Sequence, residues 1–133
     1  MSTESAKKRL RILLVDDDFE VNEALAMLLR RDGYLVSCAL SGQEAIDQLA
    51  TNPEVDVVLT DLGMPDINGW AVAGAAKDRS PEMPVGLVTG WGDDEEIESA
   101  VKRGAVDFVI TKPIDRRTLN AALARFSPGP LAA

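Results

Sequence analysis

Five short apolar runs alternate along the chain with segments in which apolar residues recur at helical spacing. The runs are short enough for strands, and the segments between them are long enough for helices that cross back over a sheet. Strands joined by such crossovers run parallel, and the crossovers are right-handed. We therefore predict an α/β fold in which a doubly wound parallel sheet of five strands is covered by five helices.

The expected elements fill the chain from residue 10 to residue 126 as one domain. Strands are predicted over residues 10–15, 34–40, 57–60, 84–89 and 106–110. Helices are predicted over residues 19–32, 41–50, 69–78, 93–103 and 115–126. Residues 1–9 and 127–133 lack periodicity, so we expect them to be flexible tails.

Several predicted helix ends carry residues that stabilise such ends. Asp18 suits the N-cap of the first helix, and Ser41 and Glu44 have the spacing of a capping box for the second. Gly33 is expected to end the first helix, because glycine adopts the backbone conformation found just beyond helix C-termini.

The composition narrows the classes of function. The chain has 14 Lys and Arg against 22 Asp and Glu, a net charge of -8, which disfavours nonspecific binding to nucleic acid or to a membrane. It lacks an apolar run of membrane-spanning length and the apolar core of a signal peptide, so we expect a cytoplasmic protein. The single cysteine, Cys38, is expected in the core. Without histidine, the chain alone cannot build a Ser-His pair, a histidine-ligated zinc site or a phosphohistidine relay.

Charged and hydroxyl side chains follow four of the five predicted strands. These residues are Asp16 and Asp17 after the first strand, Asp61 after the third, Thr89 after the fourth and Lys112 after the fifth. Because the carboxyl ends of parallel strands meet at one edge of the sheet, we expect these side chains to share a crevice. Three neighbouring carboxylates repel one another, and a divalent cation relieves the repulsion. Oxygen ligands of this kind suit Mg²⁺.

These groups suit the transfer of a phosphoryl group to a carboxylate, which needs a nucleophilic oxygen, a metal ion and donors to the remaining charge. Asp61 is the expected nucleophile, because it stands on the central strand between the acid pair on one side and Thr89 and Lys112 on the other. Taken singly, each residue could equally be a solvated loop or capping residue. The four strand ends together favour the site.

The motifs and their order resemble the receiver domain of two-component response regulators. The resemblance covers roughly residues 10–126, and the motifs that carry it are Leu14-Val15-Asp16-Asp17-Asp18, Asp61-Leu62-Gly63-Met64-Pro65 with Asn68-Gly69, Val88-Thr89-Gly90 and Lys112-Pro113. It implies the flavodoxin-like or CheY-like strand order 2-1-3-4-5, which periodicity alone cannot establish.

The resemblance also implies roles for individual residues. Asp61 would accept a phosphoryl group from the phosphohistidine of a sensor histidine kinase. Asp17, Asp61 and the Gly63 carbonyl would bind Mg²⁺ directly, and Asp16 would act mostly through water. Thr89 would move inward to bond the acyl phosphate, and Lys112 would pair with it.

The family is one of switches rather than enzymes, with at most slow autophosphorylation from small donors and slow autodephosphorylation. Its members signal through the face formed by the fourth helix, the fifth strand and the fifth helix. The resemblance therefore implies a downstream protein target, and it allows a homodimer through this face. The missing histidine is consistent with a phosphoryl donor on another protein.

Two positions depart from the family's pattern. The usual switch aromatic lies three residues before the lysine, where this chain has Val109, whereas counting from Gly104 instead aligns Phe108. Trp91 stands two residues after Thr89 and is bulky for a loop next to the site. We hypothesise that Trp91 partly covers the acyl phosphate and limits attack by water; the alternative is a tryptophan lying on the surface or in a contact.

The sequence also fits other classes of protein. A phosphatase of the haloacid dehalogenase type also uses an aspartate nucleophile with Mg²⁺, and Asp16 to Asp18 contain its Asp-x-Asp motif. Glu20 stands where that motif normally has Thr or Val, and the chain is short for such an enzyme. A receiver that only binds partners is disfavoured, because every charged site position is filled. Either a stand-alone regulator or a piece of a longer protein, such as a hybrid kinase, fits the sequence.

Overall fold

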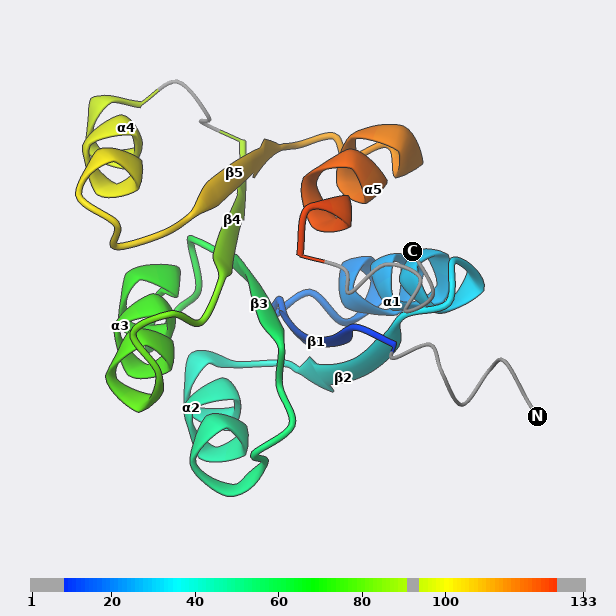
Figure 1. The fold of residues 1–133 in the computed structure, drawn as a ribbon, viewed down its shortest axis with the longest axis horizontal. Coiled ribbons are helices and arrows are strands. Elements are labelled where there is room, and N and C mark those ends of the chain that lie inside the picture. The colour runs from blue at the N-terminus through cyan, green and yellow to red at the C-terminus, as the bar shows by residue number, and fades with distance from the viewer. Residues whose placement is uncertain (1–8, 91–93, 127–133) are drawn as a thin grey trace.

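The structure is a computed structural model that describes residues 9–90 and 94–126 (Figure 1). Within these residues, five strands alternate with five helices. The strands are β1 (Arg11–Val15), β2 (Leu35–Ala39), β3 (Val57–Asp61), β4 (Val85–Thr89) and β5 (Phe108–Thr111). The helices are α1 (Phe19–Arg31), α2 (Gly42–Thr51), α3 (Gly69–Arg79), α4 (Glu95–Lys102) and α5 (Arg116–Ala124). All neighbouring strands pair in parallel, in the order β2-β1-β3-β4-β5, so the predicted fold and strand order are confirmed.

The helices cover both faces of the sheet. In Figure 1, α1 and α5 lie on one side, and α2, α3 and α4 lie on the other. Alternate side chains of β1 enter the two cores: Leu13 and Val15 face α2 and α3, whereas Ile12 and Leu14 face α1 and α5. Burial on both faces explains why the strands are almost continuously apolar. None of the helices in the described parts of the chain is both long and apolar enough for a membrane span.

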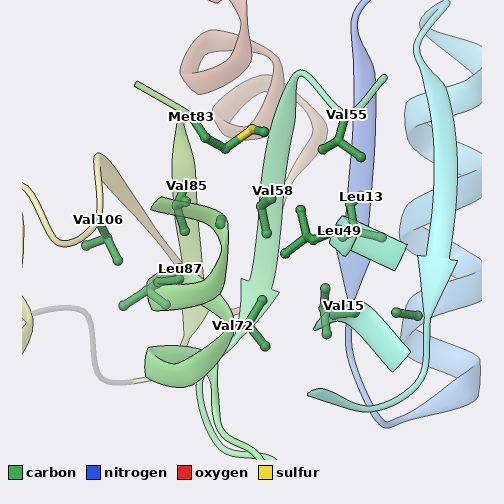
Figure 2. Close-up of a cluster of buried hydrophobic side chains, with 14 of the residues drawn as sticks. Leu13, Val15, Leu49, Val55, Val58, Val72, Met83, Val85, Leu87 and Val106 are labelled. Atoms are coloured by element: carbon green, nitrogen blue, oxygen red, sulfur yellow. The ribbon is translucent and has the colours of Figure 1, made fainter. Parts of the chain in front are cut away.

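Figure 2 shows the core on the α2 and α3 side, where Leu49 and Val72 from these helices meet strand residues such as Val58 and Leu87. Val58 and Leu87 are fully buried in this cluster. The core therefore fixes β1, β3 and β4 rigidly beside one another, and with them the residues at their carboxyl ends.

The predicted helix caps are present, with one difference. Asp18 accepts hydrogen bonds from the backbone N–H groups of Glu20 and Val21, and Ser41 accepts one from that of Glu44. The Glu44 carboxylate, however, accepts from the N–H of Leu40 rather than from that of Ser41. The box thus ties the end of β2 to the start of α2.

Four strands begin one or two residues later than predicted, and before β2 and β5 the reason is that the preceding residues still close the preceding helix. The N–H of Val106 donates to the Ala100 carbonyl at 3.4 Å, so β5 begins at Phe108. The N–H of Tyr34 likewise donates to the Leu29 carbonyl at 3.1 Å, so Tyr34 lies outside β2. Helix α5 is also shorter than predicted, with Asp115 as its N-cap and Arg125 as its C-cap.

Some predictions fall on residues that the structure does not describe. These are the tails over residues 1–8 and 127–133, the role of Trp91, and Asp93 at the expected start of the fourth helix. The described helix α4 has Asp94 as its N-cap.

Strand β2 lies at one edge of the sheet, and its environment corrects the expectation for Cys38. Cys38 is half-buried rather than in the core, and partial burial raises the pKa of its thiol. The carbonyls of Val36 and Cys38 accept hydrogen bonds from the side chains of Arg30 and Gln48. These two side chains occupy backbone carbonyls at the free edge of β2 that could otherwise pair with another strand.

Candidate functional site

Three carboxylates converge at the carboxyl edge of the sheet. One carboxylate oxygen from each of Asp16, Asp17 and Asp61 lies within 4.8 Å of the others. The convergence follows from the register. Val15 of β1 pairs with Thr60 of β3, so Asp16 and Asp61, each one residue later, lie side by side. The predicted gathering of the three acids is therefore observed.

The acids differ in exposure: Asp17 is exposed, the Asp61 side chain is 12% exposed, and Asp16 is buried. Burial raises the pKa of Asp16, the hydrogen bond from the N–H of Asp18 opposes this shift, and the charge on Asp61 adds to it. A negative charge on Asp16 is thus less favourable here than in water, and a nearby cation would stabilise it.

Lys112 supplies one positive charge to this cluster. Its ammonium nitrogen lies 3.2 Å from Asp61 Oδ1 and 3.9 Å from Asp16 Oδ2. With all three carboxylates ionised, the single ammonium leaves the cluster with a net negative charge. The oxygen donors and the remaining charge fit a divalent cation such as Mg²⁺.

Thr89 is buried at the end of β4, next to the strand that carries Asp61. Asp61 pairs in register with Val88, so Thr89 stands one residue beyond it. The Thr89 carbonyl accepts a hydrogen bond of 2.8 Å from the N–H of Lys112. The predicted hydroxyl and ammonium are therefore both brought to the edge of the sheet where the acids meet.

The backbone of Asp61 is held closely. The Thr60 hydroxyl donates to the Asp61 carbonyl at 2.9 Å, and a Cβ on Gly69 would lie only 2.5 Å from the same oxygen. Position 69 therefore requires glycine. A Cβ on Gly63 would meet no described atom within 4 Å, so that position is open. The role of the Gly63 carbonyl as a metal ligand stays a prediction.

The structure decides which residue occupies the switch position of β5. Val109 pairs with Leu87 and packs in the core beside α2, α3 and α4. Because side chains alternate along a strand, Thr89 shares the sheet face of Leu87 and Val109. Phe108 lies in the opposite core and packs against Phe126, with ring centroids 5.4 Å apart. Of the two candidates, Val109 is therefore the one on the sheet face of Thr89.

Two polar residues that contact the backbone beside the acids are not singled out by the sequence. Thr60 fits a strand and Asn22 fits the first helix, and neither pattern marks a site. Asn22 is buried and donates through its amide to backbone carbonyls at the ends of β1 and β2. A signal was available, because Asn22 interrupts the apolar stripe that continues with Leu25, Ala26 and Leu29.

The Asp-x-Asp motif of the phosphatase alternative is not assembled. Its second acid, Asp18, caps α1 and accepts from the N–H groups of Glu20 and Val21 at 3.0 and 3.2 Å. Asp18 is exposed and is absent from the acid cluster of the described residues. The acid that joins Asp16 and Asp61 is Asp17.

Comparisons with known proteins agree with this geometry. Residues 12–124 match the family described as the response regulator receiver domain. The tetrathionate response regulatory protein TtrR of Salmonella typhimurium is 40% identical over 114 residues, which are 86% of this chain and 54% of TtrR. The chain spans 25% to 54% of the length of such curated relatives.

Solved receiver domains have the same fold. One from Clostridium thermocellum superposes with a TM-score of 0.82 at 30% identity and covers 88% of this chain and 93% of its own. TrrA of Thermotoga maritima, solved in complex with Mg²⁺ and BeF, superposes with a TM-score of 0.77 at 27% identity, over 88% of this chain and 98% of its own. The chain therefore belongs to the receiver domain family of two-component response regulators, the CheY-like signalling switches.

Proposed function

We propose that this domain accepts a phosphoryl group on Asp61 from the phosphohistidine of a sensor histidine kinase, in a reaction that depends on Mg²⁺. The observation that carries the proposal is the cluster of Asp16, Asp17 and Asp61, whose charge Lys112 compensates only in part. A carboxylate oxygen of Asp61 attacks phosphorus, the P–N bond to the donor imidazole breaks, and the imidazole leaves with its electron pair and takes up a proton. Asp61 then carries an acyl phosphate.

The metal ligands in this proposal are Asp17, Asp61 and the Gly63 carbonyl, with Asp16 acting mostly through water. When bound, Mg²⁺ neutralises charge on the phosphoryl oxygens. Groups outside the cluster hold two of these acids: Asp16 accepts a 2.9 Å hydrogen bond from the N–H of Asp18, and the Asp61 carbonyl accepts one from the Thr60 hydroxyl. Their preorganisation supports in-line attack without large rearrangement.

Lys112 and Thr89 act on the product in this proposal. Lys112 lies 3.2 Å from the Asp61 carboxylate, within reach of a phosphoryl group attached there, and pairs with it. The Thr89 hydroxyl moves inward and donates to the same group. Because the N–H of Lys112 is bonded to the Thr89 carbonyl at 2.8 Å, a movement of one segment is transmitted to the other.

The output face in this proposal is formed by α4, β5 and α5, which bind a downstream protein target or a second copy of the domain. The domain works in the cytoplasm, and hydrolysis of the acyl phosphate resets it slowly. Val109 replaces the usual aromatic on the face of β5 that Thr89 shares. Its small side chain makes the coupling between Thr89 and the output face depend on packing against α4 rather than on an aromatic rotamer.

Incubation with Mg²⁺ and acetyl phosphate, followed by intact-mass measurement, tests the proposal. The parent should gain one phosphate, and Asp61→Asn should gain none. Asp66→Asn is the matched control, since Asp66 is an exposed acid in the loop that follows Asp61. It should label like the parent. Equal labelling of the parent and Asp61→Asn would disprove the assignment.

A further inference from the structure

Asn22 is a buried polar residue on the face of α1 that packs against the sheet. Its exposed fraction is 1%, and its neighbours on the same face, Leu25, Ala26 and Leu29, are buried and apolar. Burying an amide among apolar residues is unfavourable unless the amide forms hydrogen bonds. The contacts of Asn22 therefore indicate what it does.

The Asn22 amide nitrogen lies 3.3 Å from the Leu14 carbonyl, 3.3 Å from the Asp16 carbonyl and 3.0 Å from the Ala39 carbonyl. Leu14 lies near the end of β1, Asp16 directly follows β1, and Ala39 is the last residue of β2. The Ala39 carbonyl also accepts from the N–H of Asp16 at 3.2 Å. One side chain thus joins α1 to two strands where the acid pair leaves the sheet.

The contacts of Asn22 bring little net gain in stability. Its two N–H groups are shared among three carbonyls, and its Oδ1 has no hydrogen-bond partner among the described residues. A buried, unpaired amide oxygen offsets much of what the hydrogen bonds contribute. An apolar side chain of the same size would avoid that penalty, but it could not orient the carbonyls.

We infer that Asn22 is a positioning residue for the acid pair: it directs the carbonyls of Leu14 and Asp16 toward α1, so that the Asp16 and Asp17 side chains turn toward Asp61. Without its N–H groups, the Asp16 carbonyl would lose a hydrogen-bond donor beside an apolar helix face, and the peptide group that follows Asp16 would rotate. The inference deepens the proposed function, because it rests on the Mg²⁺ site described there.

Asn22→Leu tests the inference, because leucine has a similar volume and keeps α1 packed. Thermal unfolding should show a folded protein. The Mg²⁺ dissociation constant, measured by calorimetry, should rise about 10-fold or more, the loss typical of removing a residue that orients metal ligands. Asn120→Leu is the control, because Asn120 is a partly buried asparagine bonded to Asp32 rather than to the site. It should leave the constant within about twofold of the parent.

Asn22→Ser serves as a second variant if Asn22→Leu does not fold. Hydrogen exchange in metal-free protein supplies an independent measurement: the N–H groups of Asp16 and Asp18, bonded to the Ala39 carbonyl and to Asp16 Oδ1, should exchange faster in the folded variant than in the parent. Where the parent binds Mg²⁺, an unchanged dissociation constant in a folded variant overturns the inference. A parent that binds no Mg²⁺ would count against the proposed function, and exchange would then decide: faster exchange supports positioning, and unchanged exchange overturns it.

Discussion

The ammonium of Lys112 lies 3.2 Å from Asp61 Oδ1, so a cation supplied by the protein already contacts the carboxylate proposed to be phosphorylated. The ion pair joins the segment after β5 to the end of β3. It contributes positive charge that a bound metal would otherwise supply alone. Lys112 and Mg²⁺ therefore compete for the same carboxylates in the resting protein and act together on the phosphorylated one.

Lys112→Met separates these two effects. Mg²⁺ should bind several-fold more tightly, because the competing charge is gone, whereas labelling by acetyl phosphate at saturating Mg²⁺ should slow by roughly a hundredfold. Calorimetry and the time course of intact mass measure the two quantities. Lys77→Met is the control, since Lys77 pairs with Asp107 at 2.7 Å elsewhere, and it should change neither. If Lys112→Met bound Mg²⁺ more weakly than the parent, Lys112 and Mg²⁺ would not compete for these carboxylates.

Asp17 and Asp18 are adjacent in sequence, but Asp17 belongs to the acid cluster and Asp18 caps α1. Substituting each in turn separates metal binding from helix capping. Asp17→Asn should weaken Mg²⁺ binding about tenfold or more, because it removes a charged ligand from the cluster. Asp18→Asn should bind Mg²⁺ like the parent and keep its stability, because asparagine is an equally good N-cap. Calorimetry on both proteins checks the assignment, and a reversed order would refute it.

Gly42 allows α2 to approach the loop after Asp61. A Cβ at position 42 would lie 2.4 Å from the Ile67 carbonyl, whereas one on Gly74 in α3 would meet no described atom within 4 Å. Gly42→Ala should lower the free energy of unfolding by about 1–3 kcal/mol. Gly74→Ala should raise it by about 0.5–1 kcal/mol, because alanine favours the helix. Denaturant titration measures both changes, and equal changes would argue against the contact.

Asp32 links the end of α1 to α5 and gives a pH dependence. Hydrogen bonds from Arg116 and then Asn120 hold the pKa of Asp32 below its usual 3.8. Since the folded-state pKa is lowered, this contribution to stability is present above about pH 4 and is lost as the pH falls through the folded-state value. The loss of unfolding free energy in Asp32→Asn should therefore be larger near about pH 7 than near about pH 3. A loss independent of pH would rule out this linkage.

The sequence predicted the parts of the site that depend on the strand ends. Asp17, Asp61 and Lys112 each follow an apolar run, and a parallel sheet brings such residues to one edge whatever the side chains beyond it. The start of β5 was predicted too early, because the apolar Val106 resembles a strand residue but bonds back to the Ala100 carbonyl. An apolar pattern indicates which residues are buried, not which are in a strand. Val106 is buried but lies before β5.

The role of Asn22 could not be predicted in the same way. Its partners are backbone carbonyls of β1 and β2, which come together only when α1 has packed on the sheet. The switch position was undecided for a related reason. Only the register of β4 and β5 places Val109 opposite Leu87 and turns Phe108 to the other face. Contacts of this kind depend on register and packing rather than on residue type.

Asp61 is the residue that we propose becomes phosphorylated, and one measurement tests this directly. Protein labelled with acetyl phosphate and Mg²⁺ can be reduced with borohydride, which converts an aspartyl phosphate to homoserine, and the modified peptide can then be sequenced by mass spectrometry. We expect homoserine at position 61 and at no other aspartate. Homoserine at Asp16 or Asp17, or a labelled protein in which position 61 remains aspartate, would contradict the account.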